Sequence, residues 1–178
     1  MATIGFVGAR GMVGAVLLDR MRSEGDLTDN QLIFLSTSQV GKSAPLCGTQ
    51  YATAANELFK DAFDIELLKT LPIIISCQGG DYTKKILPPL RESGWDGFWI
   101  DAASAKRLDE DSIIVLSPIN AHRIDAALKA GIKNYIGGNC TVSLLLMAMN
   151  KLIEEDLVES VSVMSYQAYS GAGAAMMK

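Results

Sequence analysis

The chain of 178 residues is 49% hydrophobic and 20% charged, which supplies enough apolar sequence for a folded core and excludes an intrinsically disordered chain. Its net charge of −4 argues against a nucleic-acid partner, because such a partner usually requires a basic face. The longest strongly apolar run, residues 142–149, is too short to span a bilayer, and the first ten residues lack the features of a signal peptide.

Short apolar runs alternate along the chain with amphipathic segments, and this alternation predicts strands and helices in turn. Strands are expected at residues 4–7, 32–35, 73–75, 98–100 and 113–116. Helices are expected at residues 12–21 with Gly25 as the stop, from Asp64 as N-cap through Leu71, and at 120–130 with Gly131 as the stop. We expect Asp81 to cap a further helix, which Pro88 and Pro89 should bend or interrupt before Gly94.

These elements predict an α/β fold built on a doubly wound, mainly parallel sheet. The fully apolar run at residues 73–75 is typical of a strand covered on both faces. After residue 136 the pattern changes, because residues 141–153 predict a helix that is apolar on almost every side and residues 161–169 alternate like a strand. We therefore expect one domain at residues 1–136 and, at 137–178, the beginning of a second, truncated domain.

The first predicted strand runs into a glycine loop, Gly8-Ala9-Arg10-Gly11-Met12-Val13-Gly14, which opens the first predicted helix. A dinucleotide pyrophosphate needs backbone N–H groups, a helix N-terminus and positions without side chains, and this loop offers all three. The spacing GxxGxxG is a variant of the usual GxGxxG, so the loop predicts a Rossmann-type dinucleotide-binding domain. The alternative that the glycines serve only tight packing stays open.

The end of the second predicted strand indicates which dinucleotide would bind. Ser36, Thr37 and Ser38 stand where a site for NAD usually places an acidic residue for the ribose hydroxyls. Hydroxyl groups can donate to a 2′-phosphate, and Arg10 adds a cationic partner within the glycine loop. The sequence therefore favours NADP over NAD, unless these residues form merely a polar turn.

Three cysteines, Cys47, Cys77 and Cys140, form neither a disulfide framework nor a CxxC metal pattern, and with His122 as the single histidine we expect no metal site. Reduced thiols are the simplest interpretation, so a cytoplasmic location is expected. Cys140 follows Asn139 directly before a predicted helix, where the helix dipole and unpaired N–H groups favour a nucleophilic thiolate and can receive an oxyanion. The alternative is a small buried apolar side chain, which Cys47 and Cys77 fit better.

With these features in place, the chain resembles aspartate-semialdehyde dehydrogenase, and the branch typical of Gram-negative bacteria in particular. The resemblance covers essentially all 178 residues and rests on GFVGARGMVG, FLSTSQVGKSAP, SCQGGDYT, RESGW, WIDAAS, GGNCTVS and SYQAYSGAG, in that order. It implies an oxidoreductase of lysine, threonine and methionine synthesis, including the diaminopimelate route, that reduces L-aspartyl 4-phosphate with NADPH and releases phosphate. It also implies an NADP-binding domain at 1–136 and the start of an α+β catalytic and dimerisation domain at 137–178.

The resemblance assigns roles to individual positions. It implies that Cys140 is the nucleophile, that Gln167 orients the substrate and that Arg107 binds phosphate, as suits a planar guanidinium, although a lone surface arginine is the common alternative. It implies cofactor contacts at Arg10, Gly11, Met12, Val13, Thr37, Ser38, Gln78, Ser170, Gly171, Ala172, Gly173 and Ala174.

The family is about twice as long as this chain, and its remaining substrate clamps and its histidine acid/base lie in the other half. His122 matches no motif of the family, and residues 174–178, apart from Lys178, lack the basic and histidine side chains expected there. We therefore expect the 178-residue polypeptide by itself to show little or no dehydrogenase activity, and the full-length protein to be a homodimer. Two alternatives stay open: a non-catalytic dinucleotide-binding fragment, and a related acyl-phosphate reductase such as N-acetyl-glutamyl-phosphate reductase or glyceraldehyde-3-phosphate dehydrogenase.

Overall fold

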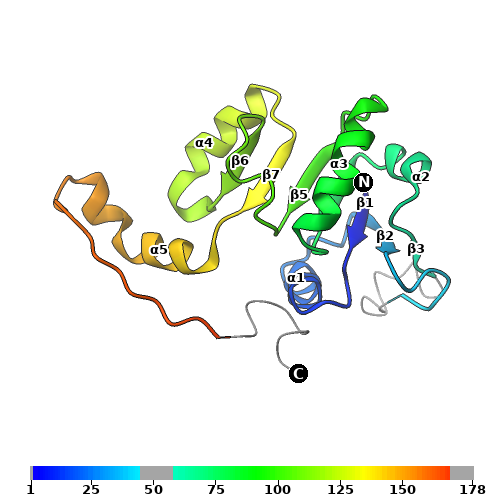
Figure 1. Ribbon diagram of the computed structural model, residues 1–178, viewed down its shortest axis with the longest axis horizontal. Coiled ribbons are helices and arrows are strands. Elements are labelled where there is room, and N and C mark those ends of the chain that lie inside the picture. Colours follow the sequence, from blue (N-terminus) through cyan, green and yellow to red (C-terminus); the bar gives the residue numbers. More distant parts are fainter. Residues whose placement is uncertain (1, 45–57, 169–178) are drawn as a thin grey trace.

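The computed structural model describes residues 2–44 and 58–168, which form one parallel seven-stranded sheet with helices around it (Figure 1). The strand order is β3-β2-β1-β4-β5-β7-β6. The strands are β1 (Ala2–Val7), β2 (Asn30–Ser36), β3 (Lys60–Asp61), β4 (Ile73–Ser76), β5 (Phe98–Asp101), β6 (Ser112–Val115) and β7 (Asn134–Gly137). The helices are α1 (Met12–Ser23), α2 (Ile65–Lys69), α3 (Gly80–Glu92), α4 (Ser117–Lys129) and α5 (Cys140–Glu154).

Apolar side chains cover both faces of the sheet, as a doubly wound fold requires. On one face, Leu18 and Met21 of α1 belong to a buried cluster with Phe6, Phe34 and Ile75 of the strands. On the other face, helices α2 and α3 and strands β4 and β5 contribute to a second cluster that includes Leu68, Ile74, Ile86, Leu90 and Trp99. The predicted α/β class and parallel sheet are confirmed.

The register of the central strands aligns their carboxyl ends. Val7 of β1 pairs with Ser76 of β4, Ser76 pairs with Asp101 of β5, and Asp101 pairs with Ile136 of β7. The loops that follow these strands therefore begin side by side along one edge. This is the edge at which ligands bind in open parallel sheets.

A buried carboxylate ties this edge together. Asp101 is 1% exposed, and its Oδ2 accepts hydrogen bonds from Thr83 Oγ1 of α3 and from Trp99 Nε1 at 3.4 Å. Its Oδ1 accepts the Ala103 N–H at 2.8 Å. A charge this deeply buried is tolerated only with such partners. Asp101 therefore links β5 to α3 and to the turn that follows β5.

The predictions for α3 need two corrections. The helix begins at Gly80 with Gly79 as its N-cap at φ +102°, so Asp81 lies in the first turn and does not cap the helix. Such a φ favours glycine, which is why the cap falls two residues earlier than predicted.

Pro88 and Pro89 do not interrupt α3, which continues to Glu92. Both prolines lie on the exposed face of the helix, as do Lys84 and Lys85 four residues earlier. The carbonyl groups that the prolines leave without a helical N–H can therefore meet water, which lowers the cost of continuing the helix.

Other local predictions hold in part. Asp64 caps α2 as predicted, since its Oδ1 accepts the Leu67 N–H at 3.1 Å. The helix expected from Asn120 begins at Ser117 instead, with Asn120 in a non-helical conformation, and it ends before Gly131 at φ +81° as expected. The strand expected at residues 161–169 is wrong for residues 161–168, which have no regular structure; residue 169 lies outside the described residues. No described strand pairs with this segment.

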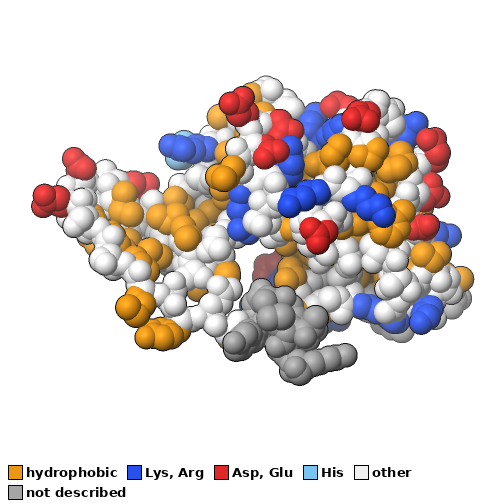
Figure 2. All heavy atoms as spheres, viewed as in Figure 1, with side chains coloured by type: hydrophobic (Ala, Val, Ile, Leu, Met, Phe, Trp, Pro, Cys, Tyr) orange, Lys and Arg blue, Asp and Glu red, His pale blue; other side chains and the backbone are white. Residues whose placement is uncertain are grey.

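Helix α5 and the segment after it extend away from the sheet, and none of the residues of α5 is buried (Figure 1). Orange side chains along this arm in Figure 2 mark its apolar surface. Exposed apolar side chains of this part of the chain include Val142, Leu144, Met147, Leu157 and Met164. Among the described residues, no helix combines the length and apolar character that crossing a membrane would demand.

Replacing Thr83 by Val should destabilise the fold, because it removes a donor from the buried carboxylate of Asp101. We expect the free energy of unfolding in urea to fall by about 1–3 kcal/mol. Thr70→Val is the matched control, since the Thr70 hydroxyl lies on the surface, and it should change stability by less than about 0.5 kcal/mol. Equal stabilities of the two variants would contradict the role given to Asp101.

Candidate functional site

The glycine loop packs too tightly for side chains. A Cβ atom added to Gly8 would lie 2.8 Å from the carbonyl carbon of Cys77, and one added to Gly14 would lie 2.2 Å from the Gly8 oxygen. Gly8 also has φ +85°, and Gly11 forms the N-cap of α1. The packing role considered for the glycines is therefore real, and it leaves the N-terminus of α1 open, with Met12 and Val13 exposed.

A cavity of about 260 Å³ adjoins this loop. Its lining combines the loop, the end of β2 and the turn after β4: Gly8, Ala9, Arg10, Gly11, Leu35, Ser36, Thr37, Ser38, Gln39, Phe59 and Gln78. The structure thus brings Arg10, Thr37, Ser38 and Gln78 together as predicted. No Asp or Glu stands among these lining residues, and helix and loop N–H groups lie nearby, so the cavity suits a phosphate-bearing nucleotide.

Cys140 is the first residue of α5, as the sequence predicts for a reactive thiol. The side chain of Asn139 caps the helix by accepting the Val142 N–H at 3.0 Å, which leaves the N–H groups of Cys140 and Thr141 without intrahelical acceptors. The Cys140 thiol is exposed, and Gln167 Nε2 lies 3.8 Å from its Sγ atom. The alternative of a buried apolar cysteine is wrong, and Gln167 lies beside the thiol.

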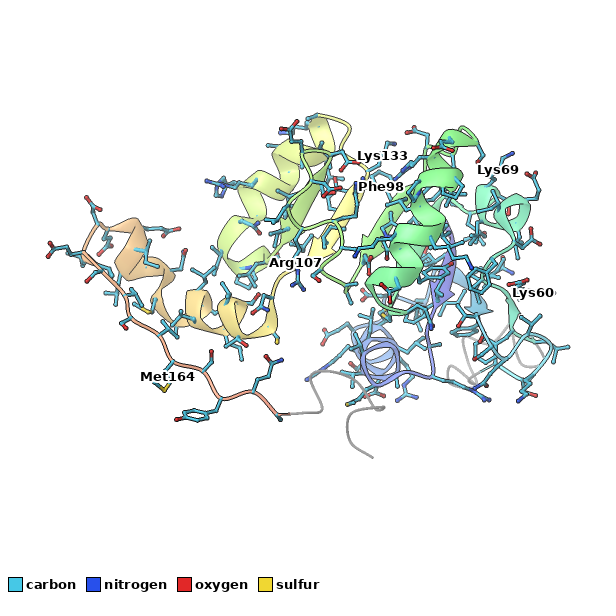
Figure 3. The ribbon with its side chains drawn as sticks, in the orientation of Figure 1. Lys60, Lys69, Phe98, Arg107, Lys133 and Met164 are labelled. Atoms are coloured by element: carbon cyan, nitrogen blue, oxygen red, sulfur yellow. The ribbon has the colours of Figure 1, made fainter. Side chains whose placement is uncertain are left out.

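Arg107 contacts the segment that leads to Cys140 (Figure 3). Its Nε donates to the carbonyl oxygen of Gly137 at 2.8 Å, and its Nη2 donates to that of Gly138 at 3.1 Å. Both acceptors are neutral, so the guanidinium keeps its charge while holding the backbone just before Asn139 and Cys140. The guanidinium carries further N–H groups that can face an anion.

The other candidates fall outside this arrangement. Cys77 follows β4 and is half-buried, and burial followed by the nearby charge of Asp101 raises its pKa from 9.0 to about 11. His122 is exposed on α4. Ser170, Gly171, Ala172, Gly173 and Ala174 lie outside the described residues, as does Cys47.

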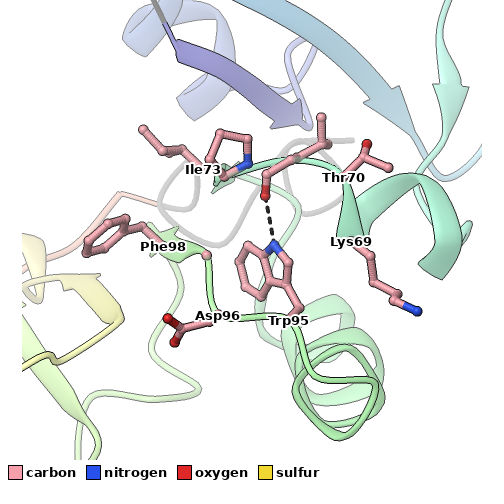
Figure 4. A pocket seen from close by; sticks show the side chains of 9 residues that line it. Lys69, Thr70, Ile73, Trp95, Asp96 and Phe98 are labelled. Atoms are coloured by element: carbon pink, nitrogen blue, oxygen red, sulfur yellow. Dashed lines mark hydrogen bonds between the residues drawn. The ribbon is translucent and has the colours of Figure 1, made fainter.

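A larger cavity of about 490 Å³ lies at the opposite edge of the sheet (Figure 4). It is lined by residues 69–73 and 95–98, which precede or begin β4 and β5, and Trp95 Nε1 donates there to the Leu71 carbonyl at 2.7 Å. Ligands of parallel sheets bind at the carboxyl ends of the strands. The candidate functional site is therefore the edge that carries the glycine loop and Cys140.

Sequence reasoning missed several residues at this edge. Asp101 could have been noticed as an acidic residue at the end of an apolar strand, and Gln39 as a polar neighbour of Thr37 and Ser38. Phe59 carries no local signal in the sequence. It lines the cavity only because the fold brings the residue before β3 close to the glycine loop after β1.

A parallel α/β sheet with a glycine loop after β1 and an adjoining cavity defines a dinucleotide-binding domain of the dehydrogenase type. Residues 3–127 match the family described as semialdehyde dehydrogenase, NAD binding domain, and the chain belongs to that family.

Solved structures agree with this assignment. The chain is 50% identical to an aspartate semialdehyde dehydrogenase from Francisella tularensis, with a TM-score of 0.90, over 99% of this chain and 47% of that one. Aspartate semialdehyde dehydrogenase II from Vibrio cholerae is 24% identical over 99% of this chain and 50% of that one, with a TM-score of 0.77. The enzyme from Candida albicans with NADP is 18% identical over 87% of this chain and 47% of that one, with a TM-score of 0.62.

The similarity to the structures from Vibrio cholerae and Candida albicans concerns the fold alone, because they are only 24% and 18% identical to this chain. This chain spans about half the length of each of these relatives. The resemblance predicted from the sequence motifs is confirmed.

Gly8→Ala should be more costly than Gly94→Ala. Both glycines have similar positive φ, +85° and +87°, so each substitution pays the cost of a left-handed alanine, about 1–2 kcal/mol. Only Gly8 also meets backbone atoms, whereas nothing lies within 4 Å of a Cβ at Gly94. We expect chemical denaturation to give Gly8→Ala a free energy of unfolding at least about 1 kcal/mol lower than that of Gly94→Ala. Indistinguishable variants would refute the tight packing of the loop.

Iodoacetamide should modify Cys140 much faster than Cys77 at neutral pH. The shift of the Cys77 pKa from 9.0 to about 11 lowers its thiolate population about a hundredfold at neutral pH, and its side chain is half-buried. Its labelling rate should rise with pH up to about 11. Peptide mass spectrometry would follow each cysteine, with the urea-unfolded chain as reference. Faster labelling of Cys77 than of Cys140 would overturn the choice of nucleophile.

Proposed function

We propose that this chain forms the cofactor-binding and nucleophile-bearing part of an NADP-dependent aspartate-semialdehyde dehydrogenase. Such an enzyme converts L-aspartyl 4-phosphate and NADPH into L-aspartate 4-semialdehyde, NADP and phosphate. The observation that carries the proposal is the exposed thiol of Cys140 at the start of α5, with the amide of Gln167 3.8 Å away. The 50% identity to the enzyme from Francisella tularensis supports this choice of substrate.

In the proposed reaction, the Cys140 thiolate attacks the carbonyl carbon of the acyl phosphate. The oxyanion that forms lies within reach of the N–H groups of Cys140 and Thr141, which the first turn of α5 leaves without helical acceptors. Collapse of this oxyanion breaks the bond to phosphate and leaves the aspartyl group as a thioester on Cys140. When bound, the nicotinamide cofactor supplies the hydride that reduces this acyl group, and the aldehyde departs as the thiolate is restored.

Arg107 and Gln167 have positioning and binding roles in this proposal. Arg107 holds the carbonyl groups of Gly137 and Gly138, and its remaining N–H groups can bind the phosphate of the substrate. Gln167 can orient the substrate by hydrogen bonding beside the Cys140 thiol. Asn139 acts through its cap, which fixes the start of α5 and so the direction of the thiol.

We propose NADP as the cofactor. The loop residues Gly8, Gly11, Met12, Val13 and Gly14 would hold its pyrophosphate. Arg10, Thr37 and Ser38 would bind its 2′-phosphate, and Gln78 would lie towards the nicotinamide. The cavity that supports this contains hydroxyl groups and a guanidinium and no carboxylate among its lining residues. The related structure from Candida albicans is described as a complex with NADP. Further contacts are proposed at Ser170 and residues 171–174.

The proposal extends to domain organisation and assembly. Residues 1–136 would form the NADP-binding domain, and residues 137–178 would begin a catalytic and dimerisation domain. This division is supported by α5, whose side chains contribute nothing to the buried clusters of the sheet. The exposed apolar arm would be covered in a full-length homodimer, since contiguous apolar surface usually marks an interface. We propose a cytoplasmic location, where a catalytic thiol stays reduced.

In an intact protein of the family's length that carries this sequence, Cys140→Ser should lower phosphate-dependent reduction of NADP by aspartate semialdehyde at least about a thousandfold. Gln167→Ala should lower kcat about tenfold to a hundredfold, because the substrate would be less well oriented. His122→Ala is the control, and it should keep activity within about twofold, since His122 lies on the surface. The 178-residue chain by itself should show little or no turnover. Full activity of Cys140→Ser would reject the proposed function.

A further inference from the structure

We infer that Gln39 is a positioning residue that makes this site prefer NADP over NAD, by holding the guanidinium of Arg10 at the cavity without neutralising it. The inference rests on the proposed function, because it concerns the nucleotide of that same site.

Three contacts fix the Arg10 guanidinium. Its Nη1 donates to Gln39 Oε1, its Nη2 donates to the carbonyl oxygen of Ser43 at 2.9 Å, and its Cζ lies 5.3 Å from the centre of the Phe59 ring. Arg10 belongs to the glycine loop, whereas Gln39 and Ser43 follow β2 and Phe59 precedes β3. The side chain therefore bridges separate parts of the cavity wall.

The groups that hold Arg10 are themselves held. The Gln39 N–H donates to Ser36 Oγ at 3.0 Å, which ties the turn to the end of β2. Phe59 is 3% exposed and packs edge-on against Phe34, with ring centres 6.3 Å apart. Gln39 thus presents its amide oxygen from a supported position, and the Phe59 ring provides a fixed surface for the guanidinium.

The chemical nature of the acceptors is what gives selectivity. An amide oxygen and a carbonyl oxygen orient a guanidinium but leave its full charge for another anion, whereas a carboxylate would neutralise it. Arg10 has further N–H groups for such an anion, and Thr37 and Ser38 of the same cavity add hydroxyl donors. NADP differs from NAD only by the 2′-phosphate. A guanidinium of Arg10 that is fixed at the cavity therefore favours the binding of NADP.

Without Gln39, the long side chain of Arg10 would have to be ordered when the nucleotide binds. Ordering one such side chain weakens binding about threefold to tenfold. That cost applies only to NADPH, because only NADPH has the 2′-phosphate that Arg10 would bind. A purely structural role for Gln39, such as holding the turn after β2, would instead weaken NADPH and NADH alike. The two roles therefore predict different selectivities.

The test is equilibrium titration of the 178-residue chain with NADPH and with NADH, followed by nicotinamide fluorescence at fixed ionic strength. The unchanged chain should prefer NADPH. Gln39→Ala should weaken NADPH about threefold to tenfold and leave NADH within about twofold. Gln39→Glu should weaken NADPH further, because its carboxylate pairs with Arg10 and repels the 2′-phosphate, again sparing NADH. Val40→Ala is the matched control, since Val40 is the exposed next residue, and it should change neither affinity.

Equal weakening of both nucleotides by Gln39→Ala, or the same affinities as for Val40→Ala, would overturn the inference while leaving the proposed cofactor in place. An unchanged chain that binds neither nucleotide would overturn both the inference and the proposed cofactor.

Discussion

The alignment of the carboxyl ends of β1, β4, β5 and β7 is the constraint on which the site depends. Backbone hydrogen bonds set this register, and Ser76 occupies its centre between Val7 and Asp101. A slip by one residue would turn every side chain of a strand to the other face and expose the apolar clusters, so the register is strongly specified. Because the strands end together, the glycine loop, the turn with Gln78, the loop with Arg107 and the start of α5 all arise at one edge.

Two arginines at this edge follow the same principle. Arg107 is held by the carbonyl oxygens of Gly137 and Gly138, and Arg10 is held by the Gln39 amide oxygen and the Ser43 carbonyl oxygen. Neutral acceptors fix the direction of a guanidinium and leave its charge unpaired, which suits a site whose proposed ligands both carry phosphate. The N-termini of α1 and α5 add partial positive charge at the same edge.

The sequence predicts the central fold well because its signals there are local. The apolar run at residues 73–75 indicates a buried strand, Gly8 indicates the turn after β1, and Asn139 before an apolar segment indicates the start of α5. What it misses depends on distant contacts. The Thr83 hydroxyl has meaning only beside the Asp101 carboxylate, and alternation at residues 161–168 makes no strand because the described part of the chain offers no neighbouring strand. The sequence predicts the N-cap of α3 at Asp81, but it lies at Gly79, because the positive φ of Gly79 sets the start of the helix.

The central claim is that Cys140 forms a thioester with the aspartyl group of the substrate. The most direct measurement is mass spectrometry of an intact protein of the family's length that carries this sequence, after brief exposure to L-aspartyl 4-phosphate and acid quench, with release by hydroxylamine to identify a thioester. The account predicts an aspartyl adduct on the peptide that contains Cys140, lost on hydroxylamine treatment and absent in Cys140→Ser. An unmodified Cys140, or an adduct on Cys77 in its place, would contradict the account.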